Sequence, residues 1–102
     1  MFKVVYSLQF YVDIWLIKDY ISFTLRDSKS AQSIIDEIMN KSESLCDFPD
    51  RYPMSFVGNA KYRRMLVKKF NVYYCVDKKT HTVTIARVLY GGLDINQVTI
   101  IN

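Results

Sequence analysis

Four residues that suit the binding of an anion stand together at positions 61–64, which read Lys-Tyr-Arg-Arg. Arginine binds phosphate through two parallel hydrogen bonds, lysine adds a compact positive charge, and a tyrosine ring offers a face for base stacking. The pattern indicates a surface for a nucleic acid or another anionic target, with the candidate binding residues Lys61, Arg63, Arg64, Lys68 and Lys69. Charged residues on a strand are often only its solvent-facing side, so that simpler interpretation stays open.

Arg63 and Arg64 are neighbours, and neighbouring residues of a strand point to opposite faces of the sheet. One of the two arginines must therefore lie over the core or beside a cleft. An unpaired guanidinium would be costly there, because a buried charge needs a partner. At least one of the two arginines is therefore expected to bind a partner group or a ligand, rather than only to face the solvent.

Arg87 is a further candidate, in the strand-like segment 82–90. With the period of two that strands have, it falls on the same face as Val83, Ile85 and Leu89, which is otherwise apolar. Arg87 is either an arginine at the edge of the core, paired with a carboxylate, or a clamp for a phosphate. The acidic residues considered for such a pair are Asp13, Glu43 and Asp94.

Tyr90 ends the same segment, just before two glycines that permit close approach of a backbone or a ligand. It is either a packed tyrosine or a group for base stacking or proton transfer. If the protein is a nuclease, its catalytic side chains are expected to be Arg63, Arg64, Arg87 and Tyr90.

Metal and covalent chemistry have little support in the sequence. His81 is the only histidine and falls in a predicted hairpin, without the nearby nucleophile that a catalytic triad needs. Cys46 and Cys75 are isolated and have no Cys-x-x-Cys spacing, so both are expected to be buried apolar residues. We expect no metal, no cofactor and no membrane partner. The start of the chain does not resemble a signal peptide, and the cytoplasm is the expected location.

Positive charge is distributed unevenly along the chain. Residues 1–60 contain six basic and eight acidic side chains, whereas residues 61–102 contain eight basic and two acidic ones. The positive field thus belongs to the C-terminal part of a chain whose formal net charge is +4. Clustered charge raises the rate of encounter with an oppositely charged partner, so a nucleic acid or an acidic protein segment is favoured.

The elements that must hold these residues follow from hydrophobic periodicity. Residues 2–6 predict a first strand, and from Ser7 the spacing becomes helical. One apolar stripe consists of Leu8, Tyr11, Val12, Trp15, Leu16, Tyr20 and Phe23, and a second consists of Phe10, Ile14, Ile17 and Ile21. We expect a helix that is apolar on two sides to be packed on two sides, by a sheet and by another helix.

A second helix is predicted after the turn at 26–30, since apolar residues recur at helical spacing from Ala31 to Met39. Pro49 and Pro53 end helical structure in the segment 46–53, and Gly58-Asn59 suits a loop. The period then becomes two in the segments 62–67, 70–77 and 82–90, whose short links suit antiparallel hairpins. The expected fold is a single α+β domain over residues 1–102, of order β-α-α-β-β-β, with an antiparallel sheet packed against an N-terminal αα-hairpin.

This order and three phrases of the sequence resemble the RelE/ParE superfamily of toxins from type II toxin–antitoxin systems. The phrases are a helix opening from Tyr6-Ser7 to Asp19-Tyr20-Ile21, the segment LCDFPDRYP at 45–53, and above all residues 62–94, YRRMLVKKFNVYYCVDKKTHTVTIARVLYGGLD. The resemblance implies a compact toxin of a plasmid-stabilisation or stress-response module. A cognate acidic antitoxin, partly disordered when free, would hold it inactive in a hetero-oligomer by laying a helix or strand over it.

The superfamily divides by target. ParE-like toxins poison DNA gyrase, whereas RelE-like and YoeB-like toxins are ribosome-dependent endoribonucleases that cleave mRNA. Matched by position, Arg63 falls where the RelE-like nucleases carry a lysine, and Tyr90 falls where many relatives have a histidine. Three residues depart from that pattern because lysine or arginine is expected in their places: Met65, Asn71 and Leu93.

The departure at Asn71 bears on the reaction. Losing one placed donor to a transition state typically costs about 3 kcal/mol. The resemblance therefore favours ParE-like inhibition of DNA gyrase, or of another essential target, through protein contacts. The alternatives are an mRNA interferase and a basic binding module without toxicity.

Overall fold

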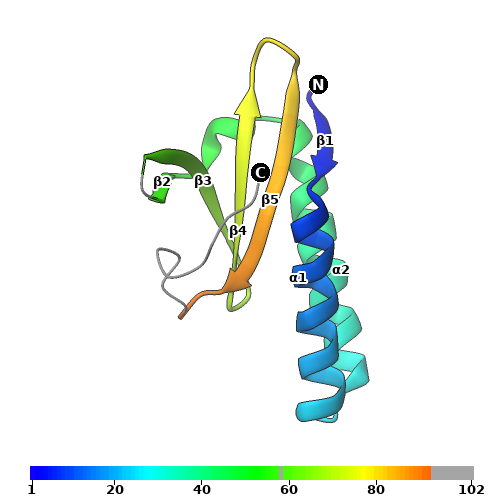
Figure 1. Cartoon of the computed structure of the whole chain (residues 1–102). Coiled ribbons are helices and arrows are strands. Elements are labelled where there is room, and N and C mark those ends of the chain that lie inside the picture. Colours follow the sequence, from blue (N-terminus) through cyan, green and yellow to red (C-terminus); the bar gives the residue numbers. More distant parts are fainter. Residues whose placement is uncertain (58, 93–102) are drawn as a thin grey trace.

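The computed structural model describes residues 1–57 and 59–92, and Figure 1 shows their arrangement. In chain order the elements are β1 (Lys3–Tyr6), α1 (Leu8–Asp19), a π-helical turn that prolongs α1 (Tyr20–Thr24), α2 (Ser28–Glu43), two 3-10 turns (Ser44–Cys46 and Pro49–Arg51), β2 (Met54–Val57), β3 (Ala60–Val67), β4 (Phe70–Asp77) and β5 (Thr82–Tyr90). The predicted α+β class and the αα-hairpin are confirmed, with β2 as an additional strand. Three residues named above, Gly58, Leu93 and Asp94, lie outside the described residues.

Polar side chains cap both helices at their starts. The Ser7 hydroxyl accepts a hydrogen bond from the Phe10 N–H at 3.0 Å and donates one to the Ala86 carbonyl at 2.7 Å, which joins the start of α1 to β5. The Asp27 carboxylate accepts a hydrogen bond from the Ser30 N–H at 3.1 Å. A cap of this kind typically contributes about 1 kcal/mol. Local sequence therefore fixes where each helix begins.

The five strands form one sheet in the order β1-β5-β4-β3-β2. Its sequential neighbours are antiparallel, but β1 runs parallel to β5, with Lys3 opposite Thr82 and Tyr6 opposite Ile85. The prediction of an antiparallel sheet is wrong for this pairing, because a hairpin link sets direction only between consecutive strands. The prediction also lacked β2, a four-residue edge strand that directly follows Pro53.

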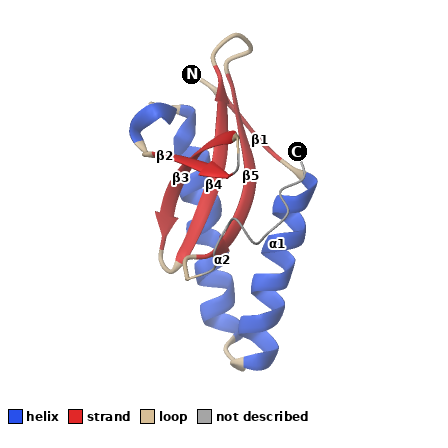
Figure 2. Cartoon of the chain, turned by 60° about the vertical axis from the view of Figure 1, so that its left-hand side comes forward, coloured by secondary structure: helices blue, strands red, loops and turns tan. Residues whose placement is uncertain are grey.

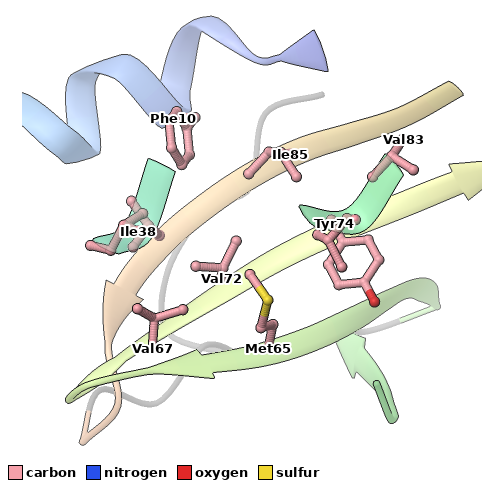
Figure 3. Close-up of a cluster of buried hydrophobic side chains, with 10 residues drawn as sticks. Phe10, Ile38, Met65, Val67, Val72, Tyr74, Val83 and Ile85 are labelled. Carbon is pink, nitrogen blue, oxygen red and sulfur yellow. The ribbon is translucent and has the colours of Figure 1, made fainter. Parts of the chain in front are cut away.

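Both helices cover one face of the sheet, and the main core lies between these two layers (Figures 1 and 2). In Figure 3, Phe10 of α1 and Ile38 of α2 point toward the strands. Burying a side chain of this size contributes about 1.5–3 kcal/mol. The buried members of the cluster are Phe10, Ile38, Leu45, Met65, Val67, Val72, Tyr74, Val83, Ile85 and Val88.

α1 packs through only one of its two apolar stripes. Phe10 and Ile21 are buried, and Ile14 and Ile17 pack against the core. The other stripe keeps between 43% and 82% of its surface exposed, over Leu8, Tyr11, Val12, Trp15, Leu16, Tyr20 and Phe23. α1 lies against both β5 and α2, as expected. The expectation that these contacts cover both apolar stripes is wrong, because α2 lies beside α1 in the same layer (Figure 2) and leaves the second stripe exposed.

β5 contains a bulge that interrupts its alternation. Its pairing with β4 shifts register between Tyr73 and Tyr74, which leaves Ala86 as an extra residue on β5. Beyond the bulge, Val88 lies in the core under the helices, and Leu89 packs against a small cluster on the second face of the sheet. The predicted alternation, which placed Leu89 on the core face, is wrong past this point because one added residue exchanges the two faces.

Candidate functional site

Arg87 is buried, and Asp13 of α1 holds its guanidinium. Arg87 Nε lies 2.7 Å from Asp13 Oδ2, and Nη2 lies 2.8 Å from Oδ1. The same carboxylate accepts a hydrogen bond from the Val88 N–H at 3.1 Å, at a point of β5 beyond the end of β1. The exposed fractions are 6% for Arg87 and 4% for Asp13. The structure therefore supports the first interpretation of Arg87, an arginine at the edge of the core that is paired with a carboxylate. Asp13 neutralises the charge of Arg87.

Arg63 lies on the helix-covered side of β3 and is also engaged. Its Nη1 donates to the Tyr52 carbonyl at 2.7 Å, and its Nη2 lies 3.4 Å from Asp50 Oδ1. Lys78 approaches the other oxygen of Asp50 at 2.9 Å. Lys78, with a smaller contribution from Arg63, lowers the pKa of Asp50. Arg63 thus attaches the segment after α2 to the sheet.

Arg64 points to the opposite face, as its adjacency to Arg63 predicts. There it shares a shallow depression of about 590 Å³ with Lys69, Asn71 and Tyr90, called the Arg64 depression below. Within residues 1–57 and 59–92, no ion pair involves Arg64 or Lys69. Two cations on one concave surface attract an anionic group. The rest of the lining is Tyr52, Pro53, Leu66, Gly91 and Gly92.

Two glycines set the position of Tyr90 at the rim of this depression. The Gly91 N–H donates to the Lys69 carbonyl at 2.7 Å, and a Cβ on Gly91 would lie 3.1 Å from that oxygen. A Cβ on Gly92 would lie 2.8 Å from the Tyr90 ring. The ring packs edge-to-face on Phe70, at 6.2 Å between centroids, and 57% of the residue is exposed. Tyr90 therefore presents an accessible ring in a fixed place, which suits stacking or contact with a partner.

Two of the residues that differ from the nuclease pattern, Asn71 and Met65, lie where the replacement of a basic residue changes the local charge. Asn71 is 8% exposed and lines the Arg64 depression, so a neutral amide stands where an arginine would add charge. Met65 is fully buried in the core under the helices, where a lysine would bury an unpaired charge. The lining of the depression thus contains two cations, Arg64 and Lys69, and two tyrosines, Tyr52 and Tyr90.

The remaining candidate lysines lie elsewhere on the sheet. Lys61 lies over the Phe56 ring, with Nζ 6.0 Å from the centroid, in a separate depression of about 620 Å³ that also contains Arg63. Lys68, in the turn between β3 and β4, lies 3.9 Å from Glu37 of α2. Neighbouring strands bring these cations together only in part, since Arg64 and Lys69 share one depression and Lys61 and Arg63 share another. Strand alternation sends them to both faces, and Arg87 is neutralised inside the domain.

A larger groove of about 1100 Å³ lies between the helical hairpin and the end of the sheet, and sequence reasoning missed it. Its lining is mostly apolar and includes Ile17, Ile34 and Val88, whose spacing is that of ordinary core residues. Four residues predicted as site residues also contribute to the lining: Lys68, Lys69, Arg87 and Tyr90. β1 accompanies β5 only as far as Ile85, and beyond that point none of the described strands pairs with β5 on this side.

Residues that could carry other chemistry are dispersed. Among the residues that the structure describes, no three His, Cys, Asp or Glu side chains are grouped so as to hold a metal ion. In the same part of the chain, no helix has the length and apolar character needed to cross a membrane. His81 is exposed, and its ring stacks on Phe2 at 4.8 Å. Cys46 and Cys75 are free thiols that are partly rather than fully buried, and burial raises the pKa of Cys75.

Comparisons with known proteins give the family. The family whose model matches residues 4–94 is described as the ParE toxin of the type II toxin–antitoxin system parDE. Among solved structures, a chain of the chromosomal ParDE toxin–antitoxin system from P. aeruginosa has this fold, with a TM-score of 0.72 and 17% identity over 88% of this chain and 96% of that chain. No curated protein matches the sequence. Because the family model matches most of the chain, this protein belongs to the ParE toxin family of type II toxin–antitoxin systems.

Proposed function

We propose that this ParE-family toxin stops growth by binding DNA gyrase, or another essential target, through the sheet face that carries the Arg64 depression. The main support for the proposal is that two of the candidate catalytic arginines, Arg63 and Arg87, are bound to other residues within the domain. Asp13 neutralises Arg87, and Arg63 is bound by Asp50 and the Tyr52 carbonyl. Arg64 and Tyr90 line the Arg64 depression, and Arg87, which Tyr90 meets in the larger groove, is already paired with Asp13.

This remaining set suits binding better than RNA cleavage. Cleavage through a ribose 2′-OH needs a proton acceptor, a proton donor and charge stabilisation around one phosphate. Binding to a protein surface needs only exposed charge and contact area. Arg64, Lys69 and the Tyr90 ring supply both, and arginine and tyrosine are enriched among residues that dominate interface energies.

One observation favours the second candidate function, a ribosome-dependent mRNA endonuclease. Arg64, Lys69 and Tyr90 line the same depression, so a phosphate bound there would meet two cations and a phenol. Such an enzyme would lack the charge that an arginine would provide in place of Asn71. Its rate would be expected to be low for this reason.

Induced expression separates the two functions. Transcript 5′ ends are mapped after induction, and purified gyrase is assayed for supercoiling in the presence of the toxin. We expect inhibited supercoiling, gyrase-linked DNA breaks and intact messages. Cuts at fixed codon positions that disappear in Tyr90→Phe would instead establish the nuclease and overturn the proposal.

A paired set of variants tests the surface itself. Arg64→Ala with Lys69→Ala is expected to abolish growth arrest at unchanged thermal stability, because neither side chain has an ion pair within the described residues. The matched control is Lys29→Ala with Lys41→Ala, which removes the same charge from exposed positions of α2. Equal loss of toxicity in both double variants would show that net charge, and not this surface, is required.

The neutralising partner is proposed to be an acidic antitoxin segment that lies in the groove beside β5. The groove offers apolar contacts, and Lys68 and Lys69 offer charge for carboxylates. Such a segment is expected to be partly disordered when free. The cytoplasm is the proposed location of both partners.

A further inference from the structure

We infer that this toxin forms a two-fold symmetric dimer in which the outer side of α1 packs against the same side of α1 in a second copy. The surface consists of Leu8, Tyr11, Val12 and Trp15, called the outer stripe below, with exposed fractions of 82%, 53%, 43% and 63%. Residues at this spacing lie along one side of a helix. An exposed and contiguous apolar surface of this kind marks a protein interaction site.

The size of the surface suits a stable dimer. The outer stripe contains two aromatic residues, and a Tyr or Trp side chain buries roughly 150–250 Å² in an interface. At their exposed fractions the four side chains supply several hundred Å² per copy, so that two copies together approach the roughly 1,000 Å² that a specific interface needs.

The outer stripe is complementary to itself when two copies of α1 run antiparallel. Its four positions are symmetric about the point midway between Tyr11 and Val12. Helices that cross at this point bring Leu8 of one copy opposite Trp15 of the other, and Tyr11 opposite Val12. At each level a ring meets a smaller side chain, which allows close packing. A two-fold axis makes each of these contacts twice, as in other isologous interfaces.

The charge distribution favours a second copy over an acidic partner at this surface. The outer stripe contains no charged residue, and Lys18 and Asp19 follow it outside the symmetric span. Residues 8–43, which form the helices, contain four basic and six acidic side chains, so the excess positive charge that would attract an acidic segment lies on the sheet and at the groove, as Lys69 does. Two copies with a formal charge of +4 repel each other least when their basic parts point apart. Contact through α1 achieves this, because both helical layers then lie between the two sheets (Figure 1).

α1 is firmly attached to the rest of the domain. The Ser7 hydroxyl donates to the Ala86 carbonyl at 2.7 Å, and Asp13 binds Arg87 at 2.7 and 2.8 Å. The outer stripe is therefore presented on a helix that is already ordered. Less conformational entropy is lost on association when a surface is ordered beforehand.

Trp15 is the only tryptophan of the chain, so it reports on this interface directly. The mass of the full-length toxin is measured by sedimentation over a concentration series, together with tryptophan emission. We expect a dimer mass at high concentration and an emission shift to shorter wavelength, because Trp15 leaves water. Trp15→Glu is expected to weaken dimerisation by at least about tenfold. The matched control Phe56→Glu, at an aromatic residue of β2 that is 57% exposed, is expected to dimerise like the unchanged protein.

A crossed pair of variants tests the antiparallel arrangement. Leu8→Glu and Trp15→Arg are each expected to be monomeric and folded by circular dichroism. Their mixture is expected to form a heterodimer, because the introduced carboxylate of one copy faces the introduced guanidinium of the other. The inference is overturned if the unchanged toxin stays monomeric, if Trp15→Glu still dimerises, or if the mixture remains monomeric. An emission shift that appears only on addition of antitoxin would overturn it as well, by assigning the surface to that partner.

Discussion

At the scale of single residues, Asp13 does more than neutralise a charge. Its carboxylate accepts hydrogen bonds from two nitrogens of Arg87 and from the Val88 N–H, so one side chain satisfies three buried donors. The bulge at Ala86 comes immediately before Arg87 and changes the direction of the strand there. A buried ion pair adds little net stability compared with apolar residues, but it fixes which residues meet. Here it fixes the position of α1 along β5.

Asp13→Asn is expected to lower the free energy of unfolding by about 3–5 kcal/mol, because it leaves the Arg87 guanidinium buried without a carboxylate. Urea denaturation at neutral pH measures this loss. Asp13→Leu combined with Arg87→Met is expected to be more stable than Asp13→Asn, since no charge then remains buried. A double variant as unstable as the single one would show that packing, and not charge, accounts for the loss.

At the scale of elements, Tyr74 of β4 attaches the segment between α2 and β2 to the sheet. Its ring is fully buried, and its hydroxyl donates a hydrogen bond of 2.6 Å to the Pro49 carbonyl. Burial raises the pKa of Tyr74 from 10.0 to about 12. The folded protein therefore keeps this proton at a pH where the unfolded chain has lost it.

Stability is expected to fall as the pH rises from 10 to about 12. Below pH 10 the phenol is protonated in both states, and its contribution is complete; above pH 10 the unfolded chain ionises first, which favours unfolding. Tyr74→Phe is expected to cost about 1 kcal/mol at neutral pH and to flatten this decline. Burial also raises the pKa of Tyr6, so part of the decline remains. Urea midpoints across this pH range test the prediction, and parallel curves for the two proteins would contradict it.

What could be predicted from the sequence is mostly local. The helix starts at Ser7 and Asp27 are determined by neighbouring residues, and the long strands by alternation over several positions. The opposite directions of Arg63 and Arg64 were predictable for the same reason. The parallel pairing of β1, the extra residue at Ala86 and the choice of Asp13 as partner of Arg87 depend on segments far apart in the chain.

At the scale of the whole molecule, the protein presents three different surfaces. The Arg64 depression lies on one face of the sheet, the apolar groove lies at the end of the sheet beside the helices, and the outer stripe of α1 faces away from the core. The three surfaces differ in charge and in shape. Lys69 and Tyr90 line both the depression and the groove, so these two surfaces adjoin, whereas the outer stripe lies apart from them on α1.

If the proposed acidic antitoxin segment lies in the groove, Lys68→Glu with Lys69→Glu is expected to slow its association by at least about tenfold at low salt, because charges at the rim of an interface act mainly on the association rate. The difference should shrink as salt rises, since the Debye length is about 8 Å at physiological ionic strength. Stopped-flow mixing measures the rates. The control is Lys78→Glu with Lys79→Glu, which makes the same change at the other end of β4. A control that slows association equally would point to overall charge.

The short β1 leaves part of β5 without a strand beside it, and Asp13 occupies the first free position there, at the Val88 N–H. An unpaired strand edge is where one folded molecule can add to the sheet of another and begin a filament. A strand that arrives from a neighbouring toxin meets a carboxylate at that position, already bonded and backed by Arg87. The residue that fastens α1 therefore also occupies a backbone donor through which a neighbouring strand would otherwise pair with β5.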